Sequence, residues 1–484
     1  MPTSTTKPQT DSMAKAGLIE RVSQKIVHYS ERWFPDAYVF VVAACALVAL
    51  AALLNGGKPT EVSKAFFEGF WSIIPFTMQM ALVAITGYVL AMSPPIAWCL
   101  QRLAAIPKTS RGAVVFTGVL SLLLSLVNWG LSLIFCGLLV RAMARRSDLR
   151  LDYRAAGAAA YLSLGCGFTL GMSSSAAQLQ ATPQSIPSSL LPITGVIGFD
   201  QTILTWQNLV VILVVTCLSA LICYLTAPSD ARVKTAQDLG IDVGEDRAPT
   251  FKRQRPGDYF EHSPILTLIV VALASGWLWE TFKDGNPLIK LSQLNAYNFV
   301  FLLLGLLLHW RTRSFLESFA KAMPSISGVL LQFPFYGGIG YMLTKVAGGD
   351  GHTVSDVIAH WFVSFANDPS TFSFLVSGYS AFLGFFIPSA GGKWVIEAPY
   401  IMSAANDLQA HLGWTLMVYN VSETLPNFLN PFWMLPLLGI LRLRSKDLIG
   451  YTSIQFIFHF PVMVILTALL MSTFTYIPPV IPTP

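Results

Sequence analysis

The chain has 484 residues, of which 54% are hydrophobic and only 12% are charged. With a mean hydropathy of +0.57 it cannot cover its apolar surface with polar groups, so the composition excludes an ordinary water-soluble protein and predicts an all-α integral membrane protein. The net charge of +5 is small and spread over loops, which argues against nucleic-acid binding, and the six cysteines show no CxxC spacing of a disulfide framework or metal site.

The first 35 residues carry five basic side chains and no uninterrupted apolar core. They predict a cytoplasmic leader with an interfacial helix rather than a cleavable signal peptide. Apolar runs long enough to cross a bilayer lie near residues 36–54, 69–91, 203–227, 263–281, 295–310, 324–345 and 449–477. One further crossing is assigned to residues 155–198.

Two of these runs repeat one pattern at a constant offset of 253 residues (332 − 79 = 253). The aligned pairs are Gln79 with Gln332, Gly87 with Gly340, Tyr88 with Tyr341 and Leu90 with Leu343. A second pair, "DAYVF" from Asp36 and "NAYNF" from Asn295, keeps the same order. Weak internal symmetry of this kind is typical of secondary transporters and predicts two structural repeats.

Residues 112–142 and 372–406 are polar or glycine-rich in the middle and predict re-entrant hairpins instead of simple crossings. Arginines and lysines flank the first stretch on both sides, so it opens to the cytoplasm, whereas aspartates flank the second, which opens to the outside. Counting from a cytoplasmic N-terminus gives nine crossings and two hairpins. The second repeat then starts on the opposite face, so the repeats are inverted.

A helix broken by polar and helix-breaking residues follows each hairpin, at "LGMSSSAAQLQATPQSIP" from Leu170 and at "VSETLPNFLNP" from Val421. Hairpin tips and broken helices of inverted repeats meet near the bilayer midplane, where hydroxyls, amides and helix N-termini suit a carboxylate or a sodium ion. The predicted substrate-binding residues are Asn128, Trp129, Ser173, Ser174, Ser389, Gly391, Gly392, Lys393 and Asn427. The residues predicted to hold a coupling ion or proton are Asn128, Gly130, Ser175, Glu397, Glu423, Thr424 and Asn430. The alternative is that small polar residues here only permit close helix packing.

Lys393 is a cation inside an apolar hairpin, where a charge is costly and usually has a partner or a function. Its predicted function is to hold an anionic substrate. The alternatives are snorkelling toward the outer interface and a structural pair with Glu397, four residues later on the same helix face. Glu397 and Glu423 are carboxylates at membrane depth, and either could carry a proton during transport. The alternative is that each only accepts hydrogen bonds from exposed backbone groups.

Four segments of the chain are similar to one known family. They are "NWGLSLIFCGLLVRAMARR", "FIPSAGGKWVIEAPYI", "LNAYNFVFLLLGLLLH" and "NFLNPFWMLPLLGI". The chain resembles the AtoE-type short-chain fatty acid transporters of bacteria, within the ion transporter superfamily, from about residue 20 onward. The resemblance implies a homodimer in the bacterial inner membrane, in which a scaffold domain supports a transport domain that moves as an elevator.

On this basis residues 36–111 form scaffold helices of repeat 1 and residues 112–227 its part of the transport domain. Residues 228–262 form a cytoplasmic linker, residues 263–345 a connector helix with the scaffold of repeat 2, and residues 372–477 its transport part. Asn128 matches the tip asparagine of the superfamily's Ser-Asn-Thr signature, with Val127 and Trp129 as altered neighbours, and Ser389 occupies the second tip. The resemblance implies a sodium site at these tips, where the charge of Lys393 could replace the ion.

The leading hypothesis is a secondary transporter for short-chain carboxylates such as butyrate or acetoacetate, driven by protons or sodium and needing no other cofactor. One alternative is a dicarboxylate carrier of the same superfamily, and another is a passive anion channel or uniporter. Direct ATP hydrolysis is disfavoured by the absence of a GxxxxGK[ST] motif. An integral-membrane enzyme is disfavoured because the seven histidines accompany neither a GxSxG nor an HExxH motif.

Overall fold

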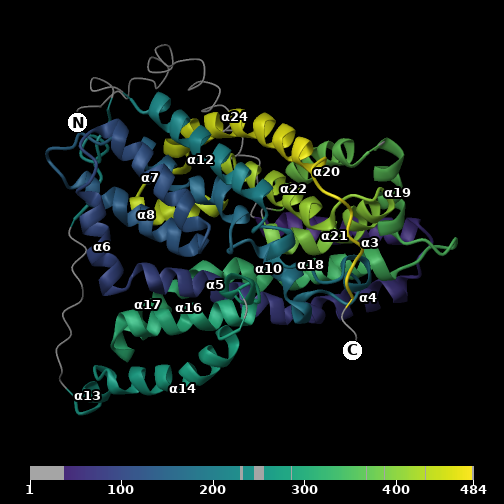
Figure 1. The fold of residues 1–484 in the computed structure, drawn as a ribbon, viewed down its shortest axis with the longest axis horizontal. Coiled ribbons are helices and arrows are strands. Elements are labelled where there is room, and N and C mark those ends of the chain that lie inside the picture. The colour runs from purple at the N-terminus through teal and green to yellow at the C-terminus, as the bar shows by residue number, and fades with distance from the viewer. Residues whose placement is uncertain are drawn as a thin grey trace, which may run out of the picture.

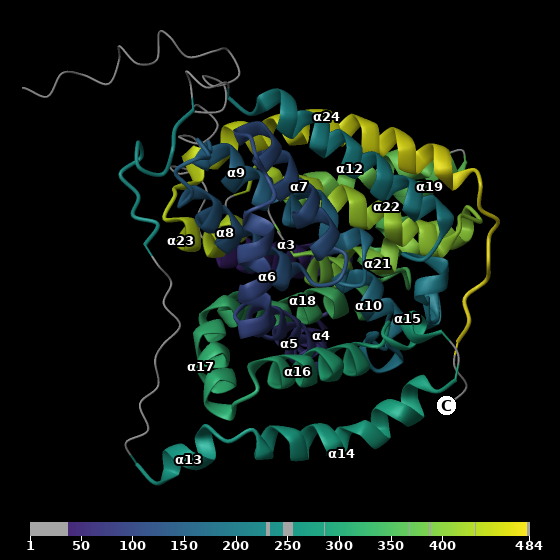
Figure 2. The ribbon, with the colours of Figure 1, turned by 60° about the vertical axis from the view of Figure 1, so that its left-hand side comes forward.

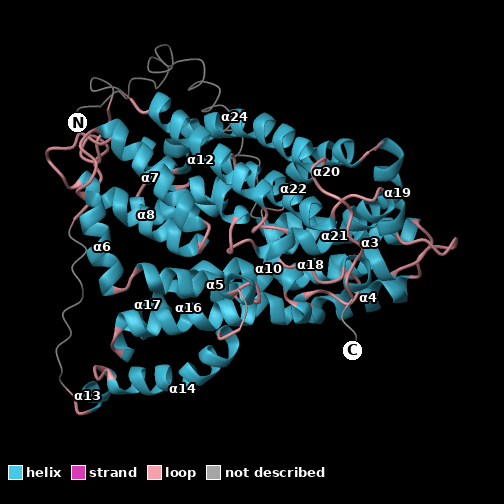
Figure 3. Ribbon diagram, viewed as in Figure 1, coloured by secondary structure: helices cyan, strands magenta, loops and turns pink. Residues whose placement is uncertain are grey.

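The computed structural model describes residues 37–228, 233–244, 255–284, 286–366, 368–385, 387, 389–430 and 432–481. In these residues helices are joined by loops, as Figure 3 shows, and the only β-type pairing is an isolated bridge between Ala347 and Thr353. The predicted leader with its interfacial helix lies outside the described residues. The all-helical architecture expected from the composition is confirmed for the described part of the chain.

Most helices of the first half lie in the predicted segments, whereas the helices Pro59–Ser72 and Pro94–Ala104 lie largely outside the predicted apolar runs. The helices of this half are α3 (Ala37–Leu54), α4 (Pro59–Ser72), α5 (Ile74–Ala91), α6 (Pro94–Ala104), α7 (Ser110–Ser125), α8 (Trp129–Ala144), α9 (Tyr153–Ala160), α10 (Ser175–Ala181), α11 (Leu191–Thr194) and α12 (Trp206–Thr226). Short turns η1 (Ser163–Gly167) and η2 (Phe168–Leu170) join α9 to α10. The predicted hairpin 112–142 corresponds to α7 and α8, which pack together.

The second half contains a similar series. It comprises α13 (Gly257–Glu261), α14 (Ile265–Phe282), α15 (Pro287–Lys290), α16 (Leu294–His309), α17 (Thr312–Ala322), α18 (Ser327–Lys345), α19 (Val354–Phe365), α20 (Pro369–Gly384), α21 (Ala390–Asp407), α22 (Leu412–Thr424), α23 (Leu435–Leu441) and α24 (Ser445–Met471). Turns η6 (Leu425–Phe428) and η7 (Phe432–Met434) lie between α22 and α23. The predicted hairpin 372–406 corresponds to α20 and α21.

Several of these segments are long and apolar enough to cross a membrane. By length and composition the described residues contain five such helical segments, Pro59–Ala91, Tyr153–Ala181, Trp206–Thr226, Ile265–Phe282 and Ser445–Met471. A sixth is formed if α17 and α18, bent by 58° relative to each other, count as one span. A chain with this many spans is a multi-pass membrane protein, whereas the predicted count of nine crossings stays a prediction.

Helix α14 lies at one edge of the molecule and α24 at the opposite edge, as Figures 1 and 2 show from two directions. Only two side chains of α14, Thr267 and Ala274, are buried. Leu273 and Trp279 are 79% and 70% exposed. A helix with such an apolar and exposed surface is suited to contact with lipid.

The repeated pattern places equivalent glycines at equivalent contacts. Gly87 of α5 faces the start of α8, where a Cβ atom would overlap with Asn128 Oδ1. Gly340 of α18 faces α21, where a Cβ atom would lie 3.0 Å from Val395 O. In each half, therefore, a small residue lets one helix approach the second helix of a hairpin closely.

The loops to which the sequence assigns one side of the membrane contact one another. Arg145 Nε donates to Val243 O at 2.8 Å, and Arg442 Nη1 donates to Asp242 O at 3.3 Å, so the linker meets the loops after α8 and α23. At the other end, Asn55 Nδ2 donates to His352 O at 2.8 Å. In both groups, loops assigned to the same side lie in contact, and the sides themselves stay a prediction.

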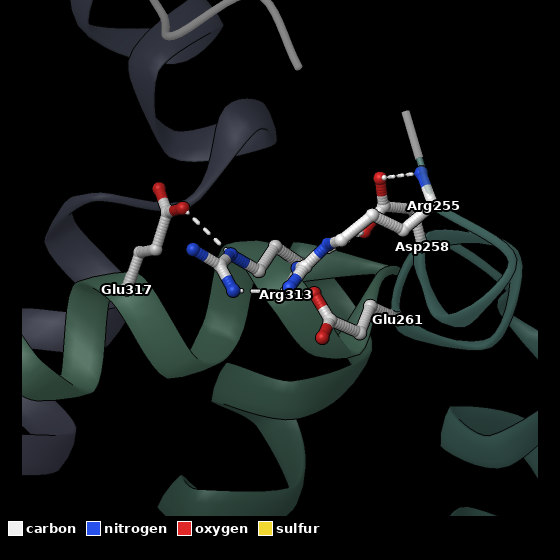
Figure 4. A network of polar contacts seen from close by, with 5 residues as sticks. All are labelled: Arg255, Asp258, Glu261, Arg313 and Glu317. Carbon is white, nitrogen blue, oxygen red and sulfur yellow. Dashed lines mark hydrogen bonds and ion pairs between the residues drawn. The ribbon is translucent and has the colours of Figure 1, made fainter. Parts of the chain in front are cut away.

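The end of the predicted linker is held on α17 by a network of ion pairs (Figure 4). Arg313 lies 2.8 Å from Glu317 Oε1 and 3.1 Å from Glu261 Oε2, while Arg255 Nη2 lies 3.2 Å from Asp258 Oδ1. These pairs are partly exposed, so each contributes little to stability. They do place the linker and the α16–α17 loop on the same side of the protein.

The crossing of α4 and α18 gives a test of the packing. A Cβ atom on Gly69 would overlap with Gly337 O, and one on Gly337 with Gly69 O, so the two backbones touch. We expect Gly69→Ala to destabilise the protein by about 1–3 kcal/mol, because the added methyl group forces the helices apart. The measurement is the apparent melting temperature in detergent. Gly276→Ala is the control, since no atom lies within 4 Å of its Cβ position and it should not lower that temperature. Equal melting temperatures for both variants would contradict the close contact.

Candidate functional site

A cavity lies where the two halves of the chain meet. Its atom-free volume, including the mouth, is about 450 Å³. The first half contributes Met80 of α5, Trp129 of α8, Leu164 and Phe168 of η1 and η2, and Ser175 of α10. The second half contributes Val329 and Phe333 of α18, Ser389, Ala390 and Gly391 at the start of α21, Asn427 of η6 and Trp433 of η7. Each half thus contributes residues from a helix that carries the repeated sequence pattern, from the start of the second helix of a predicted hairpin, and from a segment next to a helix interruption.

The helical path is interrupted in both halves, and each break is stabilised by the other. The first break begins before the predicted segment from Leu170, whereas the second lies within the predicted segment from Val421. After α9 the chain passes through η1 and η2, and after α22 it passes through η6. Asn427 Nδ2 donates to Leu164 O at 3.0 Å, and the hydroxyls of Thr169 and Thr424 lie 2.9 Å apart. Tyr161 donates to Asn427 O at 3.2 Å. Polar groups freed by one break thus find partners at the other, as a low-dielectric interior requires.

The two hairpin tips present helix N-termini, each with an N-cap residue. Asn128 Oδ1 accepts from Leu131 N at 2.9 Å, and Ser389 Oγ accepts from Gly392 N at 3.3 Å. Asn128 also donates through Nδ2 to Tyr297 Oη at 3.1 Å, and it does not line the cavity. Ser389 does line it, as does Trp129, the first residue of α8. The start of α21 therefore offers the cavity the positive end of a helix dipole.

Lys393 lies in the interior and away from the cavity wall. Its side chain and that of Glu397 are fully buried, with Nζ 2.9 Å from Glu397 Oε1. Lys393 Nζ also donates to Ser380 O at 2.8 Å, and Ser380 Oγ donates to Glu397 Oε2 at 2.5 Å. Tyr419 completes the surroundings, with its ring centre 4.7 Å from the ammonium. The geometry favours the structural pair that the sequence left open as an alternative to substrate binding.

The other predicted site residues divide into those at the cavity and those behind it. Trp129, Ser175, Ser389, Gly391 and Asn427 line the cavity. The others have structural contacts: Ser173 with Ser125 O and Phe168 O, Ser174 as N-cap of α10, Gly130 with α5, Gly392 with Tyr336, Thr424 with Thr169, and Asn430 with Phe385 O. Their roles toward a substrate or ion stay predictions.

Several lining residues were missed by sequence reasoning, and the repeat could have identified two of them. Met80 and Phe333 follow the repeated glutamines directly and are related by the same offset (333 − 80 = 253). Both face the cavity. Apolar residues in apolar helices give no other signal in a sequence. Position within an internal repeat was the only indication that these two differ from their neighbours.

Comparison with known proteins assigns the family. The model of the short chain fatty acid transporter family matches residues 18–470. The chain belongs to this family. Two similar proteins, from Escherichia coli (strain K12) and Haemophilus influenzae, are provisionally named short-chain fatty acid transporters. Each is 31% identical, over 453 and 463 residues respectively, and the alignments cover 93% of this chain and 99% of each relative. The resemblance found in the sequence is confirmed, and the family is one of transporters rather than enzymes.

Two solved structures share the fold. One is the YdaH transporter of Alcanivorax borkumensis, described as having an unusual topology, with a TM-score of 0.55, 17% identity, and coverage of 91% of this chain and 98% of that one. The other is MtrF of Neisseria gonorrhoeae, described as illuminating a class of antimetabolite efflux pumps, with a TM-score of 0.56, 16% identity, and coverage of 94% and 98%. At these identities the likeness shows the fold alone.

The buried ion pair gives a prediction about Lys393. Lys393→Ala leaves the Glu397 carboxylate buried and unpaired, so we expect a loss of about 3–5 kcal/mol of stability. The double variant Lys393→Met with Glu397→Leu should recover most of it, because no charge remains to be paired. Apparent melting temperature in detergent is the measurement.

The control for this prediction is Lys64→Ala. Lys64 also pairs with a glutamate four residues later, Glu68, but the pair is exposed and 3.8 Å apart, so its loss should change little. If Lys393→Ala is as stable as the wild type but inactive in carboxylate uptake, the structural role is contradicted and substrate binding by Lys393 is favoured.

Proposed function

We propose that this protein is a secondary active transporter for short-chain monocarboxylates such as butyrate and acetoacetate, coupled to a cation. Family membership supports transport of short-chain fatty acids. The observation that carries the proposal is the chemistry of the cavity: the described residues that line it include hydroxyls, one amide and a helix N-terminus, but no charged side chain. One carboxylate fits the start of α21, and a short apolar tail fits Met80 and Phe333.

The same lining argues against a dicarboxylate carrier but does not distinguish a coupled carrier from a passive channel or uniporter. A dicarboxylate has a second negative charge, and a carrier for it needs a second cationic or strongly donating group, which the described lining does not offer. A passive channel or uniporter shares the cavity requirements and differs only in its energetics. It is distinguished by flux that ion gradients leave unchanged.

The proposed mechanism is alternating access by an elevator movement of inverted repeats. Its support is that each half contributes residues from the same three kinds of segment to the cavity, and that loops assigned to opposite faces form two separate contact groups. In this proposal α7–α8 and α20–α21 are the re-entrant hairpins of the transport domain. The homodimer, the bacterial inner membrane and a cytoplasmic N-terminus are carried over from the family resemblance and the positive-inside pattern.

The test of the proposed function is uptake of labelled butyrate by proteoliposomes, with protein-free vesicles to measure passive entry of the neutral acid. We expect saturable uptake that a cation gradient stimulates, with competition by acetoacetate and none by succinate. Competition by succinate would favour the dicarboxylate carrier. Saturable flux that no gradient stimulates would favour the channel or uniporter.

The apolar wall gives a prediction about chain length. Met80 is 3% exposed and faces the cavity, so Met80→Ala enlarges the space for the tail. Each buried methylene contributes about 0.8 kcal/mol, so we expect the ratio of kcat/KM for hexanoate to that for butyrate to rise about tenfold. Met78→Ala is the matched control, because Met78 lies on the same helix but is 50% exposed. An equal change of this kcat/KM ratio in both variants would show that Met80 does not determine chain-length selectivity.

A further inference from the structure

Three buried side chains on one face of the second broken helix have acceptor oxygens without donors. Asn420, Glu423 and Asn427 are spaced by three and four residues, which places them on one side of α22 and η6. They are 0%, 1% and 1% exposed. Asn420 Oδ1, Glu423 Oε2 and Asn427 Oδ1 have no hydrogen-bond partner among the described residues. Buried acceptors of this kind are costly, so their grouping needs an explanation.

The amide nitrogens of the two asparagines have partners, and the carbonyl partner of Asn427 fixes the orientation of that amide because a carbonyl can only accept. Asn420 Nδ2 donates to Ser174 Oγ at 3.0 Å, and Asn427 Nδ2 donates to Leu164 O at 3.0 Å. In each asparagine the oxygen is therefore the free atom. Asn420, Glu423 and Asn427 thus form a row of acceptor oxygens, and this row lacks a hydrogen-bond donor.

The buried charges near the row are unequal in number. Lys393 forms an ion pair with Glu397 Oε1, and Ser380 Oγ donates to Glu397 Oε2. Glu423 is a second carboxylate within electrostatic reach of both. One ammonium cannot neutralise two carboxylates, so the ionised cluster carries one excess negative charge at membrane depth, where such a charge is unfavourable.

The other titratable groups around Glu423 do not supply a positive charge. Tyr336 of α18 and Tyr419 of α22 are also within reach of it. Of the remaining elements packed on α22, α20 carries Tyr379 paired with Tyr400, α24 carries His459 paired with Ser219, η1 carries Cys166 beside Ser219, and α10 and η2 carry none. At its start α24 also carries Lys446, Asp447 and Tyr451.

A metal ion does not fit the row as a whole. Seven residues of helix rise span roughly 10 Å, whereas hard cations bind oxygen ligands at about 2.4 Å. A proton fits, because a protonated carboxyl group donates one hydrogen bond. Its O–H can serve either neighbouring amide oxygen, Asn427 at the cavity wall or Asn420 farther along α22.

We propose that Glu423 is the proton carrier of this transporter. It binds one proton at Oε2, and the resulting O–H donates a hydrogen bond to the amide oxygen of Asn427 or Asn420. The proposal rests on the proposed function, and it names the coupling ion. A carboxylate in the cavity lies next to Asn427 and adds a second excess negative charge near Glu423. Substrate and proton therefore favour each other's binding. One proton and one monocarboxylate carry no net charge, so the cotransport is electroneutral; the proton is taken from water on one side and released on the other.

The experiment compares the wild type with Glu423→Gln in proteoliposomes on which a pH gradient, a sodium gradient and a membrane potential are imposed separately, after subtraction of flux into protein-free vesicles. Wild-type protein should accumulate butyrate when the outside is acidic, with no stimulation by a sodium gradient or a membrane potential. Glutamine imitates the protonated carboxyl group, so Glu423→Gln should retain exchange of labelled for unlabelled butyrate but lose at least tenfold in accumulation driven by pH. Glu68→Gln, an exposed carboxylate, is the control and should behave as wild type.

Two further variants keep the test decisive if Glu423→Gln does not fold. Asn420→Leu and Asn427→Leu each remove one of the two acceptors offered to the O–H bond, so the variant that loses the acceptor in use weakens proton binding. In that variant the pH of half-maximal uptake should move to lower values, since more acid is needed to protonate Glu423. An unshifted pH of half-maximal uptake in both variants, pH-driven accumulation by Glu423→Gln, or a wild type driven by sodium alone would each overturn the proposal. Absence of any saturable carboxylate flux in the wild type would instead overturn the proposed function.

Discussion

The structure depends on one constraint, which is that backbone and side-chain polar groups inside a membrane protein must find partners within the protein. Two helices are broken at the cavity, and each break would leave such groups unpaired if it stood alone. Asn427 donates to Leu164 O across the gap, and Thr169 and Thr424 pair beside it. The two breaks therefore have to meet, and by meeting they create the cavity between the halves of the chain.

The same constraint separates two kinds of polar residue near the cavity. Asn128 and Ser174 cap helices and have their hydrogen-bonding groups engaged, so they hold the walls in place. Ser175, Ser389 and Asn427 reach the open space. Neutral polar groups at a helix N-terminus suit an anion without the cost of a buried cation at the wall. The absence of charge in the described lining supports the proposed selectivity for one carboxylate with an apolar tail.

The charged residues lie one layer deeper. Lys393 forms an ion pair with Glu397, and Glu423 is a second carboxylate within electrostatic reach of both, so the three groups carry one excess negative charge when all are ionised. A buried imbalance of this size can be removed by one proton and restored by its loss. A group that changes charge behind the wall, one helical turn from Asn427, links the electrostatics of the interior to the occupant of the cavity.

Composition and local spacing alone determined the membrane class, the apolar helices, the two interruptions and the family resemblance, because each depends on residues close together in the chain. The repeat also contained, unnoticed, the equivalence of Met80 and Phe333. Only the tertiary structure decided which polar residues face the cavity. The sequence predicted substrate binding by both Lys393 and Asn128, although neither lines the cavity. The direction of a side chain depends on which helices pack around it, and these come from distant parts of the chain. The pairing of Lys393 with Glu397 and the free oxygen of Glu423 are results of that packing.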